Sequence, residues 1–231
     1  MTWDAKSAVQ DALHQAVKQD GYAIAPDAVP EDVLRGLDQA LDAGQAGTRN
    51  LLSVPAVRNL VASGPVRQLV EPVLGPNAFA VRGIFFNKLP GANWKVPWHQ
   101  DCVIAVRERN DMPGWGPWSV KDGVPHVRPP AEVLAKMLAI RIHLDNCGGE
   151  DGPLRVLPGS YSHGFLKDAE ILGWPREAAV TCAVRRGDAI LMRPLLLHAS
   201  SAAAEPANRR VIHIEFANGE LPGGMQWHER V

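Results

Sequence analysis

The stretch Pro97-Trp98-His99-Gln100-Asp101 decides how the rest of this chain is interpreted. His99 and Asp101 are separated by one residue, so their side chains point to the same side of an extended segment. An imidazole and a carboxylate on one face need only a second histidine to complete a three-ligand iron site. The stretch therefore predicts a metal site whose remaining ligand lies elsewhere in the chain.

The bulk composition is that of an ordinary soluble protein. The chain has 231 residues, of which 46% are hydrophobic and 21% charged, and we expect one domain over residues 1–231. The net charge of -1 provides no field for nucleic acid or an anionic membrane. Cys102, Cys147 and Cys182 form no CxxC motif, which argues against a disulfide framework or a thiolate zinc site.

The N-terminus lacks the hydrophobic core of a signal peptide, and no apolar run is long enough to span a bilayer. With the isolated thiols, this favours a cytoplasmic location. We expect a small-molecule substrate as the partner, neither nucleic acid nor membrane, and a monomer or a homodimer.

Residues 1–77 are predicted to be mainly helical. Apolar residues recur at helical spacing from Ala8 to Val17, and Asp20-Gly21 ends that run. A second helix is expected from Pro30, and shorter ones over residues 55–62 and 65–74. We expect these helices to cover one face of a sheet.

Residues 78–217 are predicted to be β-rich, followed by a C-terminal tail over 218–231. Nineteen Pro and 21 Gly indicate many turns between short strands, as in a sandwich or jelly roll. Strands are expected at residues 79–88, 103–106, 137–145, 154–157, 180–184, 189–192 and 209–217. The irregular segment 107–131 is predicted to be an active-site lid, because long loops in compact domains are commonly functional.

Three pairs in the sequence alternate a histidine with an acid. Two of them, His143/Asp145 and His213/Glu215, are interpreted as polar pairs that satisfy one another along a strand. The pair His99/Asp101 differs, because a loop leads into it and places it at a rim that a ligand can reach.

His198 is the natural third ligand. It follows an apolar strand and precedes the small residues Ala199 and Ser200, and we expect it to face the first pair from a distant strand. Arg209 lies eleven positions further on, at the start of the last strand. Its guanidinium can hold a carboxylate with two parallel hydrogen bonds.

These residues resemble the phytanoyl-CoA dioxygenase family of iron(II)/2-oxoglutarate oxygenases. The resemblance covers about residues 78–217 and rests on stretches in family order: Asn87-Lys88-Leu89-Pro90, Pro97 to Asp101, Gly152 to Ser160, His198-Ala199-Ser200 and Arg209. It implies a double-stranded β-helix with His99, Asp101 and His198 on iron. It also implies that Arg209, helped by the Ser200 hydroxyl, grips the distal carboxylate of 2-oxoglutarate.

The resemblance also suggests further pocket residues. Arg141 falls on the strand that lines the cosubstrate chamber in such proteins, where some members have an aromatic residue. The other cosubstrate candidates are Asn87 and Gln100, each with a plain structural role as the alternative. The candidates for substrate contact are Trp115, Trp118, His126, Phe86 and Lys88, although the two tryptophans can equally pin the segment 107–131 to the core.

The implied reaction consumes 2-oxoglutarate and O₂ and releases succinate and CO₂. Because Asp101 keeps the carboxylate that related halogenases lack, hydroxylation or another C–H oxidation such as desaturation is favoured over halogenation. Two alternatives stay open: a cupin-like metal enzyme that does not use 2-oxoglutarate, and a non-catalytic barrel that binds a small molecule. The first has little use for Arg209, and the second has no need of an intact metal set.

Overall fold

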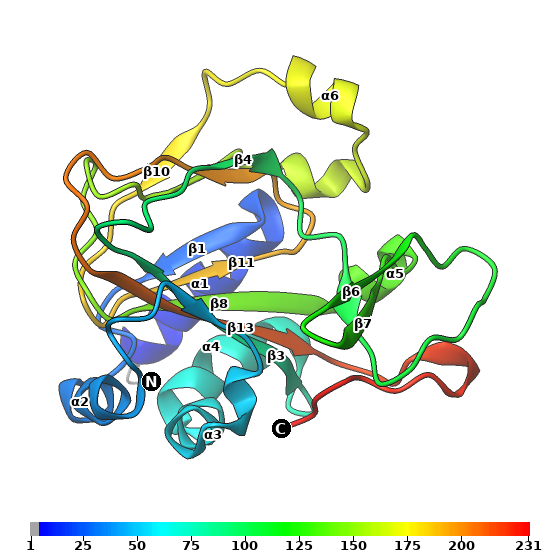
Figure 1. Ribbon diagram of the computed structural model, residues 1–231, viewed down its shortest axis with the longest axis horizontal. Helices are drawn as coiled ribbons and strands as arrows, with labels where there is room; N and C mark the ends of the chain where they lie inside the picture. Colours follow the sequence, from blue (N-terminus) through cyan, green and yellow to red (C-terminus); the bar gives the residue numbers. More distant parts are fainter. Residues whose placement is uncertain (1–4) are drawn as a thin grey trace.

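The computed structural model describes residues 5–231, so the first four residues of the predicted helical portion lie outside it. Two antiparallel sheets face each other, and helices cover the outer side of the larger one (Figure 1). The larger sheet has six strands in the order β1-β11-β8-β13-β3-β2, and the smaller has four in the order β10-β9-β12-β4. This is the mainly β, jelly-roll-like architecture that the sequence predicts.

The strands of the larger sheet are β1 (Tyr22–Ala25), β2 (Gly47–Thr48), β3 (Phe79–Lys88), β8 (Met137–His143), β11 (Ala189–Met192) and β13 (Arg209–Ala217). The smaller sheet contains β4 (Val96–His99), β9 (Leu154–Val156), β10 (Val180–Cys182) and β12 (His198–Ser200). A separate three-stranded sheet contains β5 (Ile104–Ala105), β6 (Trp118–Lys121) and β7 (Val124–Val127). The helices are α1 (Ala5–Asp20), α2 (Glu31–Ala40), α3 (Pro55–Ala62), α4 (Gly64–Leu74), α5 (Ala131–Leu134) and α6 (Asp168–Gly173).

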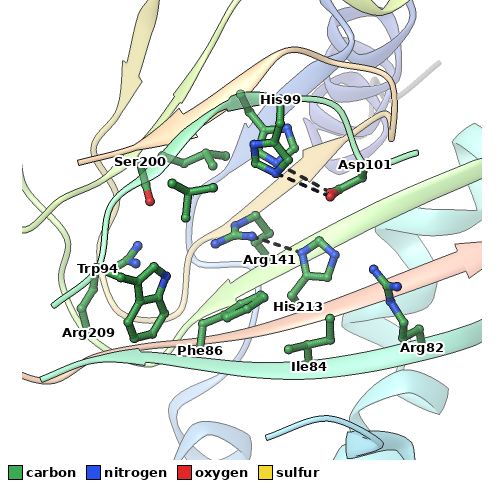
Figure 2. A pocket seen from close by; sticks show the side chains of 13 residues that line it. Arg82, Ile84, Phe86, Trp94, His99, Asp101, Arg141, Ser200, Arg209 and His213 are labelled. Atoms are coloured by element: carbon green, nitrogen blue, oxygen red, sulfur yellow. Dashed lines mark hydrogen bonds and ion pairs between the residues drawn. The ribbon is translucent and has the colours of Figure 1, made fainter. Parts of the chain in front are cut away.

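Alternation along β13 explains how one strand serves both the core and the site. Ile212, Ile214 and Phe216 are fully buried in the main hydrophobic cluster, which α1 to α4 also line. Burial of each such side chain contributes roughly 1.5–3 kcal/mol. The alternate residues Arg209 and His213 point to the other face, toward the smaller sheet (Figure 2).

The predicted helices and long strands are present nearly as expected. The structure adds short elements that the sequence pattern did not indicate, among them β1, β2, β4, β12, α5 and α6. Strands of two to four residues carry too little periodicity to be recognised, and their neighbours in the sheet determine them.

The prediction of an irregular segment over 107–131 is wrong in its central part. Strands β6 and β7 form a hairpin there, joined by Asp122-Gly123. Both turn residues have positive φ, at 51° and 79°, as a type I′ turn requires. The Asp-Gly pair is the sequence signal that identifies this hairpin.

No helix within residues 5–231 is long and apolar enough to cross a membrane.

Candidate active site

His99 and His198 come together because their strands are neighbours. In the antiparallel register of β4 and β12 they are directly opposite one another, and their ring centroids lie 4.1 Å apart. His198 was expected to face the first pair from a distant strand. Its strand is distant in sequence, but it lies directly beside β4 in the same sheet. Asp101 follows two residues after His99, where its backbone N–H donates to the carbonyl oxygen of Pro194 at 2.9 Å.

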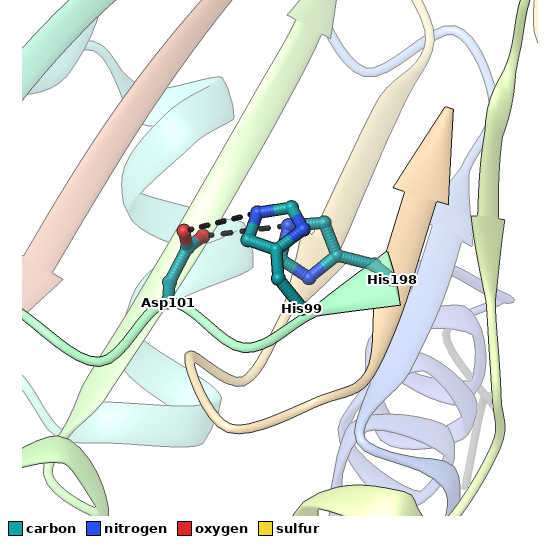
Figure 3. A group of neighbouring side chains, drawn as sticks. All are labelled: His99, Asp101 and His198. Atoms are coloured by element: carbon teal, nitrogen blue, oxygen red, sulfur yellow. Dashed lines mark ion pairs between the residues drawn. The ribbon is translucent and has the colours of Figure 1, made fainter. Parts of the chain in front are cut away.

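The three side chains point at a common centre (Figure 3). The Nε2 atoms of His99 and His198 each lie 3.7 Å from a different carboxylate oxygen of Asp101. One ligand atom from each residue lies within 4.8 Å of the other two. These separations exceed those of hydrogen bonds, as expected of groups that share an ion instead of bonding one another.

Backbone carbonyl groups determine which nitrogen of each imidazole can bind a metal. His99 Nδ1 lies 2.9 Å from the Pro97 carbonyl oxygen, and His198 Nδ1 lies 2.9 Å from that of Leu196. Because a carbonyl oxygen only accepts, each Nδ1 carries the proton and donates it. Each Nε2 then has a lone pair directed at Asp101. This is the arrangement that orients metal-binding histidines, so the residues present fit a 2-His-1-carboxylate metal centre.

The electrostatic surroundings favour the metal-binding protonation states. Burial lowers the pKa of His198 to about 4, against the opposing effect of Asp101. Burial alone would raise the pKa of Asp101, but its interactions with the basic side chains around it, His198 first among them, outweigh burial and hold that pKa below its usual range. At neutral pH these two groups are therefore a neutral imidazole and a carboxylate.

The triad opens into a cavity of about 230 Å³ between the two sheets (Figure 2). Side chains from both sheets and from the loop before β4 line it: Arg82, Ile84, Phe86, Trp94, Val96, His99, Asp101, Arg141, Leu154, His198, Ser200, Arg209 and His213. The three converging side chains and Arg209 therefore share one cavity.

Arg209 lines this cavity with free hydrogen-bond donors. Arg209 is only 4% exposed, and its Nε and Nη1 atoms have no hydrogen-bond partner among the described residues. Burial lowers the pKa of this guanidinium from its usual value, against the opposing effect of the Cys147 thiol. Buried donors without partners are rare and costly, so this group fits a carboxylate ligand.

Lys88 lies behind the part of the cavity wall that Ser200 and Arg209 form, and it donates a hydrogen bond to Ser200. Its ammonium donates to the Ser200 hydroxyl oxygen at 3.2 Å, to the Gly152 carbonyl oxygen at 3.3 Å and to that of Ser201. Burial, followed by the charge on Arg209, lowers the pKa of Lys88 to about 8. Lys88 was predicted to contact substrate, but it lies outside the cavity lining and acts through Ser200.

Asn87 and Gln100 also lie outside the cavity lining, which favours the structural role for each over contact with the cosubstrate. The Asn87 side chain accepts from the Arg209 backbone N–H at 3.0 Å and donates to the Ala43 carbonyl oxygen at 2.8 Å. Gln100 donates to the carbonyl oxygens of Gly164 and Leu195, at 2.8 and 2.7 Å, and accepts from the Leu166 N–H at 2.9 Å. Asn87 thus positions Arg209, and Gln100 ties the ligand strand to a neighbouring loop.

Of the predicted substrate-contact residues Phe86, Trp115, Trp118 and His126, only Phe86 lines the cavity. Phe86 lines the cavity, whereas Trp115 and Trp118 pack against a second hydrophobic cluster that includes Val127 and Trp227. His126 is 3% exposed, and its Nδ1 lies 3.0 Å from the Val124 carbonyl oxygen. The two tryptophans and His126 therefore hold the hairpin β6–β7 in place and do not line the cavity.

Three polar or aromatic lining residues were missed by sequence reasoning. They are Arg82, His213 and, from a loop, Trp94. Arg82 forms an ion pair with Glu215. His213 accepts a hydrogen bond at its Nδ1 atom from Nη1 of Arg141, at 3.2 Å. His213 and Glu215 thus form a polar pair, as expected, but His213 also lines the cavity. The alternation Arg82-x-Ile84-x-Phe86 along β3 was the signal that could have identified this wall.

Trp94 reaches the cavity from the loop between β3 and β4. Asn93 exchanges two hydrogen bonds of 2.8 Å with the backbone of Ala203, which fixes this loop beside the segment after β12. Nothing in the local sequence indicates that contact. The remaining histidine–acid pair is structural, because His143 is buried away from the lining and Asp145 pairs with Arg210 at 2.6 Å.

Known structures share this architecture. The epimerase SnoN in complex with Fe3+, alpha ketoglutarate and nogalamycin RO is 16% identical, with a TM-score of 0.69 and coverage of 94% of this chain and 92% of that one. The alpha ketoglutarate dependent carbocyclase SnoK is 15% identical, with a TM-score of 0.69 and coverage of 94% and 87%. HygX from Streptomyces hygroscopicus, with nickel and 2-oxoglutarate bound, is 14% identical, with a TM-score of 0.64 and coverage of 89% and 85%.

At these identities the likeness shows the fold alone. No curated protein matches the sequence significantly. The sequence profile described as Phytanoyl-CoA dioxygenase (PhyH), in contrast, matches residues 42–211, well over half of the chain. The chain therefore belongs to the phytanoyl-CoA dioxygenase family of iron(II)/2-oxoglutarate-dependent oxygenases.

Proposed function

We propose that this protein uses iron(II), 2-oxoglutarate and O₂ to hydroxylate, or otherwise oxidise, an unactivated C–H bond of a small molecule. Succinate and CO₂ are the coproducts. One observation carries the proposal: a 2-His-1-carboxylate set and a buried arginine with unpaired donors line the same cavity.

In this proposal the metal is held by Nε2 of His99, Nε2 of His198 and the carboxylate of Asp101. Iron(II), 2-oxoglutarate and O₂ together supply the oxidising power for attack on a C–H bond. The protein contributes the tautomer of each imidazole through the carbonyl groups of Pro97 and Leu196. Those two hydrogen bonds keep each Nε2 free of a proton and directed into the cavity.

Arg209 would bind the distal carboxylate of 2-oxoglutarate, with the Ser200 hydroxyl as a second donor. Lys88 supports this contact because it bonds Ser200 from behind and adds positive charge. The Asn87 side chain fixes the backbone of Arg209, so the guanidinium need not be ordered when the ligand binds.

The remaining lining supports C–H oxidation of a small molecule. Phe86, Trp94 and Leu154 present apolar surface in a cavity of about 230 Å³, which favours exclusion of water from the reacting carbon. Asp101 occupies the position whose loss would leave room for a halide, so its carboxylate favours hydroxylation over halogenation.

The direct test is anaerobic addition of iron(II) and 2-oxoglutarate to the purified protein. A weak visible charge-transfer band should appear with wild type and be absent in His99→Ala. His14→Ala, in α1, is the matched control and should keep the band. Absence of the band in folded wild-type protein would reject the proposal.

The cupin-like and non-catalytic alternatives predict different behaviour. A metal enzyme that does not use 2-oxoglutarate would keep much of its turnover in Arg209→Ala, whereas the proposed enzyme would lose it. A non-catalytic binding protein would bind a metabolite without releasing succinate. Screening metabolites for stimulated succinate release distinguishes the last case and identifies the substrate.

A further inference from the structure

Arg141 is a buried cation in the cavity wall. It lies on β8, is 9% exposed, and its guanidinium carbon lies 5.6 Å from the centroid of the Phe86 ring. Figure 2 shows its guanidinium beneath the imidazole of His99. Its Nε has no hydrogen-bond partner within residues 5–231, and no ion pair formed by these residues includes it.

The contact with His213 does not neutralise Arg141. An arginine can only donate, so the Nδ1 atom of His213 that lies 3.2 Å from Arg141 Nη1 must hold a lone pair. His213 is therefore a neutral imidazole with its proton on Nε2, directed at Glu215 at 3.4 Å. Glu215 in turn pairs with Arg82. The chain of contacts orients Arg141 and leaves its charge uncompensated.

Loading the cavity would not supply the missing negative charge. Iron(II) carries two positive charges and 2-oxoglutarate two negative ones, so together they add none. Arg209 would pair with the distal carboxylate, and Asp101 with the metal. Arg82 already has Glu215 as its partner. Arg141 is the lining cation left without a counter-charge, and an unpaired buried charge is costly.

We propose that the substrate carries a carboxylate or a comparable anionic group, and that Arg141 binds it next to the metal centre. This inference rests on the proposed function and narrows it from any small molecule to a small organic anion. The bound anion would hold the substrate in the cavity by charge-assisted hydrogen bonds, which leaves its C–H bonds to be presented to the metal.

The probes are two acid–amide pairs, acetate with acetamide and benzoate with benzamide. Each is titrated anaerobically into the wild-type iron(II)–2-oxoglutarate complex while its charge-transfer band is recorded. We expect at least one acid to perturb the band saturably and its neutral amide to have no saturable effect. This contrast needs no variant, so it stands even if substitutions at Arg141 impair folding.

Two variants assign the effect to Arg141. Arg141→Gln keeps a hydrogen-bond donor for His213 but removes the positive charge. It should lower the affinity for the acid about 10- to 100-fold. Its affinity for 2-oxoglutarate should change less than about threefold, within the spread of a neutral substitution. Arg141→Lys, which restores the charge without the planar fork, should recover part of the affinity for the acid.

The outcomes are separable. If acids and amides act alike, or if Arg141→Gln binds the acid as wild type does, the assignment of Arg141 is overturned. A loss of 2-oxoglutarate affinity in Arg141→Gln of about tenfold or more would also overturn it, because Arg141 would then serve the cosubstrate. If no band forms in wild type, the proposed function itself fails, and the inference fails with it.

Discussion

His99 and His198 are direct cross-strand partners on β4 and β12, with ring centroids 4.1 Å apart. Both imidazoles direct an Nε2 lone pair toward Asp101, so a divalent ion bound between the three groups would interact favourably with all of them. Because the unfolded chain lacks this arrangement, binding of the ion should be coupled to stability.

We predict that Ni(II), a redox-stable substitute for iron, stabilises the folded wild-type protein. At a free concentration 100 times its Kd, the ion should add about 2.7 kcal/mol and raise Tm by about 5–10 °C. Differential scanning fluorimetry measures this shift. It should disappear in His198→Ala and persist in His14→Ala, and an equal shift in His198→Ala would place the ion elsewhere.

We predict that Arg209→Met lowers 2-oxoglutarate affinity about 10- to 100-fold and leaves metal affinity unchanged. Arg210→Met is the matched control, because the neighbouring Arg210 side chain pairs with Asp145 and Asp38 instead of lining the cavity. It should lower stability while keeping 2-oxoglutarate affinity. Titration of the charge-transfer band measures both, and equal affinities in the two variants would contradict the assigned role of Arg209.

We predict a stability signature of Lys88 at alkaline pH. The pKa of Lys88 is about 8 in the folded protein, against 10.5 for an ordinary lysine. Between these values the unfolded state binds more protons, so the free energy of unfolding gains a contribution that increases with pH. The cost of burying the charge is fully present below pH 8 and is relieved toward pH 10.5.

Urea denaturation of wild type and Lys88→Met at pH 7.5, 8.5 and 9.5 isolates this contribution. The stability of wild type relative to Lys88→Met should increase across the series, because titrating groups other than Lys88 contribute to both proteins. A relative stability that is constant over this range would show that Lys88 keeps an ordinary pKa.

We predict that Gln100→Ala mainly affects folding. The variant leaves the buried Leu195 carbonyl oxygen, the partly buried Gly164 carbonyl oxygen and the Leu166 N–H without their partner, at a cost of about 2–4 kcal/mol in the free energy of unfolding. Metal and 2-oxoglutarate binding should survive at low temperature, where the variant stays folded. Normal stability with lost 2-oxoglutarate affinity would instead return Gln100 to the cavity.

Sequence periodicity was sufficient for the elements that are long. The helix pattern from Ala8 to Val17 and the alternation from Arg209 to Ala217 are properties of neighbouring residues, and both elements are present. The proximity of His99, Asp101 and His198 to one another, with Arg209 in the same cavity, could also be predicted, because these residues follow a family order that residue types and spacing preserve.

Tertiary structure alone decided which polar residues reach the cavity. Gln100 lies between His99 and Asp101 in sequence, yet its side chain forms hydrogen bonds with a distant loop. His213, interpreted as one half of a polar strand pair, lies in the cavity wall. The charge left on Arg141 was equally invisible in the sequence. Residue type determines which bonds a side chain can form, but strand register and long-range packing determine which partners it finds, and which donors find none.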